Sequence, residues 1–180
     1  MKRKILCLSM LWLALLSSSA QDSPGKKVPS VTMSPPPVAN ITRGKAGTVE
    51  LHFRIGSGFH INSNTPKSEY LIPTTLKLNA PTDIVVGRVT YPPGQEASFP
   101  FAPDEKLSVY GGDFTLAVMI RPLAHVLPGK YALHGELKYQ ACDNAACYPP
   151  RKFPVDFEVK VAKAAPPPKK NPGQSPHVHR

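Results

Sequence analysis

The sequence predicts an all-β protein built as an antiparallel β-sandwich, and three segments with two-residue periodicity are its main support. Apolar and polar residues alternate over residues 49–55, 131–139 and 155–161, which is typical of strands with one buried face. After the N-terminal 20 residues, no segment has the 3.6-residue apolar stripe of an amphipathic helix. Seven or so short strands are therefore expected in the central part of the chain, about residues 38–162, and they favour a sandwich.

Weaker patterns add to the set of expected strands. Three further strands are predicted at residues 75–79, 84–89 and 114–121. Turn signals rich in glycine, proline, asparagine or aspartate separate the strands. These are Gly56-Ser57-Gly58, Ala80-Pro81-Thr82-Asp83, Pro92-Pro93-Gly94, Gly111-Gly112-Asp113 and Pro128-Gly129-Lys130. The chain shows no internal repeat.

The N-terminal 20 residues have the organisation of a secretory signal peptide. Three basic residues at positions 2–4 precede an apolar stretch at 5–16 and the small residues of 17–20, which predicts cleavage after Ala20. The apolar stretch is shorter than the roughly 20 residues that span a membrane, so no stable membrane span is expected. Cys7 would leave with the signal. Two cysteines would then remain in an exported, oxidising compartment.

The net charge of +10 and the 22 prolines are concentrated toward the ends of the chain. Residues 38–162 contain 13 basic and 11 acidic side chains, whereas 21–37 and 163–180 each contain five prolines. We therefore expect a proline-rich linker at 21–39, a folded domain at 40–162 and a disordered tail at 163–180. No aromatic residues for base stacking accompany the basic ends, so no nucleic-acid partner is expected.

The remaining cysteines, Cys142 and Cys147, are separated by the turn-like residues 143–146 and flanked by strong strand patterns. They would face each other at the tip of a hairpin, close enough for a disulfide. Such a short loop gives little stabilisation, and a disulfide there opens easily by thiolate attack. An inert structural bridge stays open as the alternative.

No metal site is expected. The cysteine pair supplies only two of the four ligands that a zinc ion needs, and His177 and His179 lie in the predicted tail.

The segment 139–150, YQACDNAACYPP, resembles the active-site hairpin of the N-terminal periplasmic domain of the thiol:disulfide interchange protein DsbD. The shared features are Tyr139, the two cysteines and Tyr148-Pro149-Pro150. Weaker similarity covers about residues 40–162, including 49–61, 89–92 and 109–112. The resemblance implies an immunoglobulin-like sandwich and no cofactor.

The resemblance also implies roles for individual residues. Cys147 would form the mixed disulfide with a partner and Cys142 would resolve it. An aromatic cap at 98–110 would shield the sulfurs, with Phe101 the first candidate and Phe99 and Tyr110 the others. The near-site residues are Tyr139, Asp143, Tyr148 and Pro149. Lys138, Arg151 and Lys152 favour a thiolate and Asp143 opposes one, so modest activation controlled by the cap is expected.

The function implied by the resemblance is exchange of reducing equivalents with periplasmic proteins, including those of cytochrome c biogenesis. After the signal the chain has neither the membrane segments nor the C-x-x-C domain of the DsbD relay. We therefore expect a thioredoxin-like or membrane electron donor in trans, and periplasmic thiol–disulfide proteins as acceptors. The competing interpretation is a secreted β-sandwich binding module whose disulfide is structural.

Overall fold

The structure is a computed structural model that describes residues 28–164, and this part of the chain contains twelve strands and no helix. The predicted signal peptide and most of the predicted tail lie outside the described residues. No helix in the described part is long and apolar enough to cross a membrane. The strands are β1 (Val31–Ser34), β2 (Ala39–Thr42), β3 (Gly47–Ile55), β4 (His60–Asn62), β5 (Thr75–Asn79), β6 (Ile84–Thr90), β7 (Gln95–Phe99), β8 (Ala102–Gly111), β9 (Asp113–Pro122), β10 (Gly129–Tyr139), β11 (Ala141–Cys142) and β12 (Arg151–Ala162).

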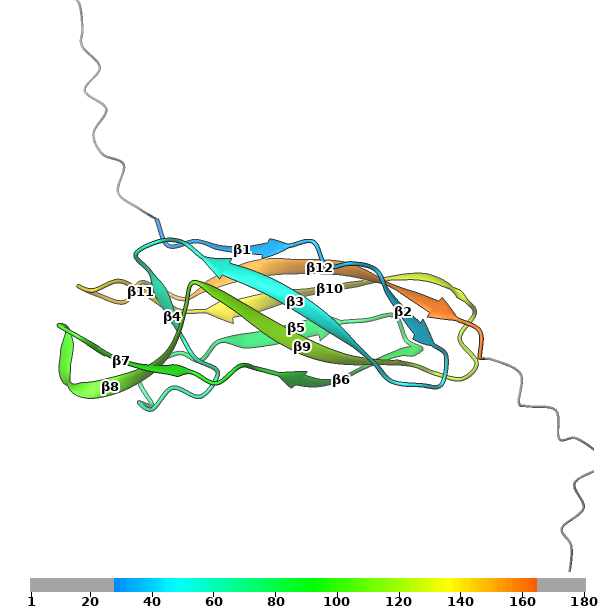
Figure 1. Cartoon of the computed structure of the whole chain (residues 1–180), viewed down its shortest axis with the longest axis horizontal. Helices are drawn as coiled ribbons and strands as arrows, with labels where there is room; N and C mark the ends of the chain where they lie inside the picture. The colour runs from blue at the N-terminus through cyan, green and yellow to red at the C-terminus, as the bar shows by residue number, and fades with distance from the viewer. Residues whose placement is uncertain (1–27, 165–180) are drawn as a thin grey trace, which may run out of the picture.

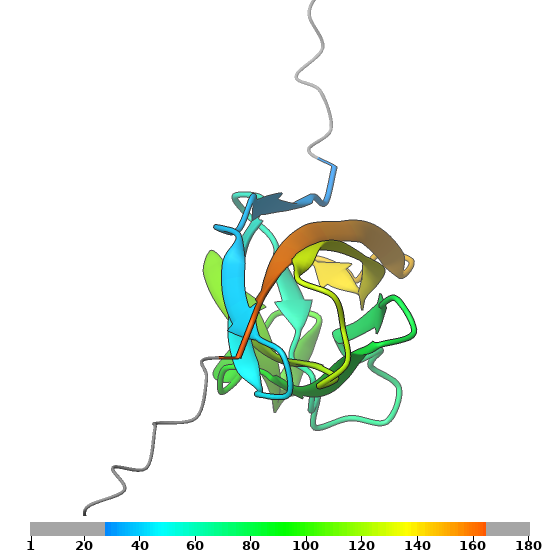
Figure 2. The same cartoon turned by 90° about the vertical axis from the view of Figure 1, so that its right-hand side faces the viewer.

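Two four-stranded sheets form an immunoglobulin-like sandwich (Figure 1). One sheet has the order β1-β3-β9-β6 and the other β2-β12-β10-β5. Every pairing in them is antiparallel except that of β2 with β12, which is parallel. Seen end-on, the strands wrap around a shared interior (Figure 2). The predicted fold class is therefore confirmed.

The alternating segments of the sequence supply the core between the two sheets. In β3, Val49, Leu51, Phe53 and Ile55 are buried, whereas the residues between them are exposed. The same alternation runs along β9, β10 and β12. Burying one face of each strand removes a continuous apolar surface from water, and this is the main stabilising contribution to a sandwich.

The folded domain begins earlier than the expected boundary at residue 40. Val31–Ser34 forms β1, which pairs with β3 from Val31 opposite Ile55 to Ser34 opposite His52. The prolines at 35–37 interrupt pairing after β1, and the chain then crosses to the other sheet as β2. Because β1 is short and lies beside these prolines, composition alone suggested a linker.

A third sheet, with the order β11-β4-β8-β7, lies at one end of the sandwich (Figure 1). The β7–β8 hairpin and the loop between β11 and β12 project at this same end. The sequence patterns missed all four of these strands. This sheet contains Cys142, the last residue of β11.

Candidate functional site

Cys142 and Cys147 form a disulfide with an S–S distance of 2.05 Å. Cys142 ends β11, and the two cysteines are also opposed as an isolated antiparallel bridge. The Tyr148 amide donates to the Ala141 carbonyl at 2.8 Å, and the Asp143 amide donates to the Ala146 carbonyl at 3.0 Å. The loop of residues 142–147, hereafter the cysteine loop, is therefore the hairpin tip that the sequence predicted.

The two cysteines differ in their access to solvent. Cys142 is fully buried, whereas Cys147 is partly exposed. The difference arises because β11 is held inside by β4, whereas Cys147 lies where the chain leaves the loop. An external thiol or disulfide therefore approaches Cys147 more readily than Cys142.

The side chain of Asp143 organises the cysteine loop. Its Oδ1 accepts hydrogen bonds from the amides of Ala145 at 2.8 Å and Ala146 at 2.9 Å. Its Oδ2 accepts one from the Tyr148 hydroxyl at 2.6 Å. The Tyr148 hydrogen bond, followed by the two amide bonds, lowers the pKa of Asp143, and the same bond to Asp143 raises the pKa of Tyr148. A carboxylate therefore stays ionised within a few residues of both sulfurs.

His60 of β4 is the cross-strand partner of Cys142. On its other side, His60 is opposite Gly111 of β8, which has no side chain. His60 is only 7% exposed, and its Nε2 is buried without a hydrogen-bond partner. Burial lowers the pKa of His60, and the negative charge of Asp143 partly opposes this effect. An unpartnered buried polar atom costs about 1–3 kcal/mol, so this arrangement opposes folding.

Two phenylalanines of the β7–β8 hairpin continue from His60 as a stack of rings. The Phe99 ring lies parallel to the imidazole with centroids 3.9 Å apart. The Phe101 ring is stacked on Phe99 at 5.5 Å. We call His60, Phe99 and Phe101 the aromatic stack. The structure thus places Phe99, rather than the first-ranked Phe101, against the neighbour of Cys142.

Tyr110, the third aromatic residue expected in the cap, does not join the aromatic stack. It pairs with Ile61, one position away from the pair of His60 with Gly111, so its side chain points to the opposite face of the sheet. Its ring stacks on Phe114 and its hydroxyl donates to Asn64 Oδ1 at 2.6 Å. Tyr110 belongs to the main core.

The other near-site residues surround the cysteine loop in different ways. Tyr139 is buried at the end of β10, and burial raises its pKa. Tyr148 packs edge-on against Phe59, with centroids 5.8 Å apart, while Pro149 is exposed. The loop is thus anchored on both sides by tyrosines, one in the core and one against the segment that precedes β4.

The sequence patterns missed Gln140 and Asn62, whose amide side chains hold the site together. Gln140 Oε1 accepts hydrogen bonds from Asn62 Nδ2 at 3.0 Å and from the Ile72 amide at 3.1 Å. Its Nε2 donates to the Tyr148 carbonyl at 3.3 Å. Gln140 lies between Tyr139 and Cys142 in the sequence, and this position was enough to mark it as a candidate site residue. No local pattern marks Asn62 or His60 as buried.

Two cations that were candidates for activating a thiolate are engaged elsewhere. Arg151 donates to the Pro29 carbonyl at 2.6 Å. Lys152 forms an ion pair with Glu136 at 2.8 Å. The residue next to Cys142 in the chain is Asp143, whose hydrogen bonds keep its carboxylate ionised, and a negative charge disfavours a thiolate.

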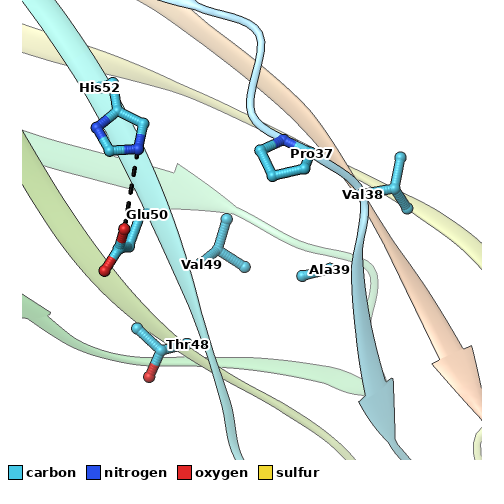
Figure 3. A pocket seen from close by; sticks show the side chains of 7 residues that line it. All are labelled: Pro37, Val38, Ala39, Thr48, Val49, Glu50 and His52. Atoms are coloured by element: carbon cyan, nitrogen blue, oxygen red, sulfur yellow. Dashed lines mark ion pairs between the residues drawn. The ribbon is translucent and has the colours of Figure 1, made fainter.

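A surface pocket between β3 and the start of β2 is separate from this site. It is lined by Pro37, Val38, Ala39, Thr48, Val49, Glu50 and His52, none of which belongs to the third sheet. Figure 3 shows His52 and Glu50 side by side at its edge, as an ion pair of 3.8 Å. Within residues 28–164, no three His, Cys, Asp or Glu side chains are grouped as metal ligands would be.

An immunoglobulin-like domain with a cysteine pair at one end of its sandwich is the class that this fold and site define. The family model described as "Thiol:disulfide interchange protein DsbD, N-terminal" matches residues 31–158. The chain therefore belongs to this family. No curated protein matches the chain.

Several solved structures are similar to parts of the chain. The N-terminal domain of Neisseria meningitidis DsbD in the reduced form is 24% identical, with 61% of this chain and 74% of that chain covered and a TM-score of 0.40. The same domain in its complex with the PilB N-terminal domain is 25% identical, with 61% and 73% covered and a TM-score of 0.38. The N-terminal periplasmic domain of ScsB from Proteus mirabilis is 13% identical, with 75% and 48% covered and a TM-score of 0.48.

Proposed function

We propose that this chain is an exported periplasmic domain that passes reducing equivalents to partner proteins by thiol–disulfide exchange through Cys142 and Cys147. The observation that carries the proposal is the asymmetry of the disulfide, in which a fully buried cysteine is joined to a partly exposed one. Membership of the DsbD N-terminal family supports the same chemistry. Cys147 is the residue that partners reach, and Cys142 is the resolving cysteine.

The exchange proceeds in two balanced steps. In the reduced domain the Cys147 thiolate attacks a partner disulfide, a Cys147–partner bond forms, and one partner sulfur leaves as a thiolate. Cys142 then loses its proton and attacks the Cys147 sulfur. This closes the Cys142–Cys147 bond and releases the second partner sulfur. Two electrons pass to the partner, and a thioredoxin-like or membrane donor in trans reduces the domain again.

A purely structural role for the disulfide is disfavoured by its position. The bridge closes a loop of residues 142–147, for which loop-closure entropy gives only roughly 2 kcal/mol of stabilisation. The core between the two main sheets does not depend on this loop. A structural disulfide would stabilise the fold more if it joined segments that are distant in the sequence.

The β7–β8 hairpin is proposed as a cap that controls access to the sulfurs. Phe99 covers His60, which is beside Cys142, and Phe101 extends this cover. A docking partner that displaced the hairpin would admit its own cysteine to Cys147. Control of access suits a site in which the charge beside Cys142, that of Asp143, gives no activation of the thiolate.

The test is to trap the mixed disulfide. In a Cys142→Ser variant, Cys147 can attack a partner but nothing resolves the product, so a covalent complex should accumulate in a periplasmic extract. The matched Cys147→Ser variant keeps only the buried cysteine and should trap nothing. Mass spectrometry of the bands that disappear on reduction identifies the partners.

The reduction potential of the Cys142–Cys147 pair gives an independent test. A potential within the range of exchanging dithiols, above about −300 mV, is expected. A much lower potential, together with no trapped complex in the Cys142→Ser variant, would show that the disulfide is the inert bridge of a binding module.

A further inference from the structure

We propose that His60 is the base that takes the thiol proton of Cys142 when Cys142 resolves the mixed disulfide. The proposal rests on the exchange reaction proposed above and assigns a role to a residue outside the cysteine loop. His60 belongs to β4, which is far from Cys142 in the sequence, and the two meet through strand pairing.

The need for a base follows from the burial of Cys142. A thiol is a poor nucleophile and must become a thiolate to attack the Cys147 sulfur. Cys142 is fully buried, and burial disfavours the charged form of a thiol. Asp143 adds a negative charge nearby, which disfavours it further. Deprotonation of Cys142 therefore requires a neighbouring group to accept its proton.

The register of the third sheet supplies His60 as that neighbour. His60 is directly opposite Cys142, and directly opposed residues project from the same face with Cβ atoms about 4.5–5.5 Å apart. From β8 the position beside His60 is Gly111, so no side chain of that strand competes for the imidazole. His60 Nε2 is buried and has no hydrogen-bond partner, which leaves it free to accept a proton.

The groups packed against His60 fit this role. Phe99 of β7 and Gly111 of β8 carry no titratable group, and β11 contributes Cys142 itself. The charged group that acts on His60 is Asp143, whose carboxylate opposes the lowering of the His60 pKa by burial. A neutral imidazole is ready to act as a base at neutral pH, and Asp143 stabilises the imidazolium that results.

The step balances. The S–H bond of Cys142 breaks and its proton moves to His60, while the Cys142–Cys147 disulfide forms. The bond between Cys147 and the partner breaks, and its electron pair leaves with the partner sulfur. When a donor reduces the domain, the same proton returns from His60 to the departing Cys142 sulfur.

The experiment uses the purified reduced chain and Ellman's reagent, so no natural partner is needed. Attack by Cys147 releases one thionitrobenzoate and leaves a mixed disulfide, and resolution by Cys142 releases a second. In the parent chain, the rate of the second release should already have reached its plateau at about pH 6.5, the ordinary pKa of histidine, because burial lowers the pKa of His60 below that value. In His60→Gln, the rate should keep rising with pH through about 8.5, the ordinary thiol pKa, because burial disfavours the Cys142 thiolate, and at pH 7 it should fall at least about tenfold.

The matched control is His52→Gln, which removes an exposed histidine of β3 and should keep the parent profile. A parent rate that climbs through pH 8 without a plateau, or a His60→Gln profile that matches the parent, would overturn the proposal. If His60→Gln does not fold, the Asp143→Asn variant tests the proposal instead. Loss of the Asp143 charge should lower the pKa of His60 further and so move the start of the plateau to lower pH. A plateau that starts at the same pH as in the parent would show that His60 is not the base. Because Ellman's reagent replaces the partner, these outcomes are independent of whether a natural partner is trapped.

Discussion

The Tyr148 hydroxyl donates a 2.6 Å hydrogen bond to Asp143 across the cysteine loop. Asp143 also accepts from two backbone amides between the cysteines, and none of these bonds involves sulfur. The loop is therefore held in shape by contacts that do not require the disulfide. In the reduced domain this arrangement keeps the two thiols close together and so favours closure of the disulfide.

Asp143→Ala should therefore make the disulfide easier to reduce. Loss of the three hydrogen bonds loosens the reduced loop, and the two thiols spend less time in contact. We expect the thiol–disulfide equilibrium constant to change two- to tenfold, which is about 10–30 mV toward a less reducing potential. The potential is measured by equilibration with glutathione buffers. Asp143→Asn keeps an oxygen for the two amides and should stay near the parent, whereas equal shifts in both variants would show that charge is the cause.

Phe99→Ala should speed the reduction of the disulfide by small thiols. Phe99 covers His60 directly, whereas Phe101 covers Phe99, so the expected order of rates is Phe99→Ala, then Phe101→Ala, then the parent. We expect about a tenfold increase for Phe99→Ala, measured as the loss of the disulfide in dithiothreitol. Tyr70→Ala, at an exposed aromatic residue in the loop after β4, is the control. Equal rates in all four proteins would contradict a capping role for the hairpin.

The sequence predicted the elements whose burial follows a local pattern, and it missed those whose burial depends on pairing with distant strands. The strands β3, β10 and β12 were found because a strand with one buried face has a local two-residue pattern. The cysteine pair was found because its spacing and turn residues are also local. β8 was missed because its first half is charged and exposed, and it is a strand because it pairs with β7. Burial of His60 and Asn62 depends on pairing with distant strands, which no local pattern records.

The stability of the oxidised domain should decrease as the pH falls below about 6.5, and His60 should contribute to the decrease. Burial lowers the pKa of folded His60 below its unfolded value. Between these two pKa values the unfolded chain binds a proton that the folded chain does not. The free energy of unfolding therefore decreases as the pH falls. One proton gives a slope of at most about 1.4 kcal/mol per pH unit.

The measurement is the free energy of unfolding in urea between pH 7 and pH 5. His60→Gln should remove this part of the slope, because glutamine does not titrate. His52→Gln should retain it, since His52 is exposed on β3. A His60→Gln protein with the same pH slope as the parent would mean that His60 is not held neutral by burial.

Reduction of the disulfide should leave the domain folded. The bridge closes only residues 142–147, and its loss should cost roughly 2 kcal/mol of loop-closure entropy. The main core is formed mostly by the facing strands of the two large sheets and does not include either cysteine. Urea unfolding with and without a phosphine reductant measures the difference. The double variant Cys142→Ala/Cys147→Ala, which has no bridge to lose, should show no response to the reductant. A parent chain that unfolds on reduction would require the disulfide to be a structural element, because a domain that alternates between redox states must stay folded in both.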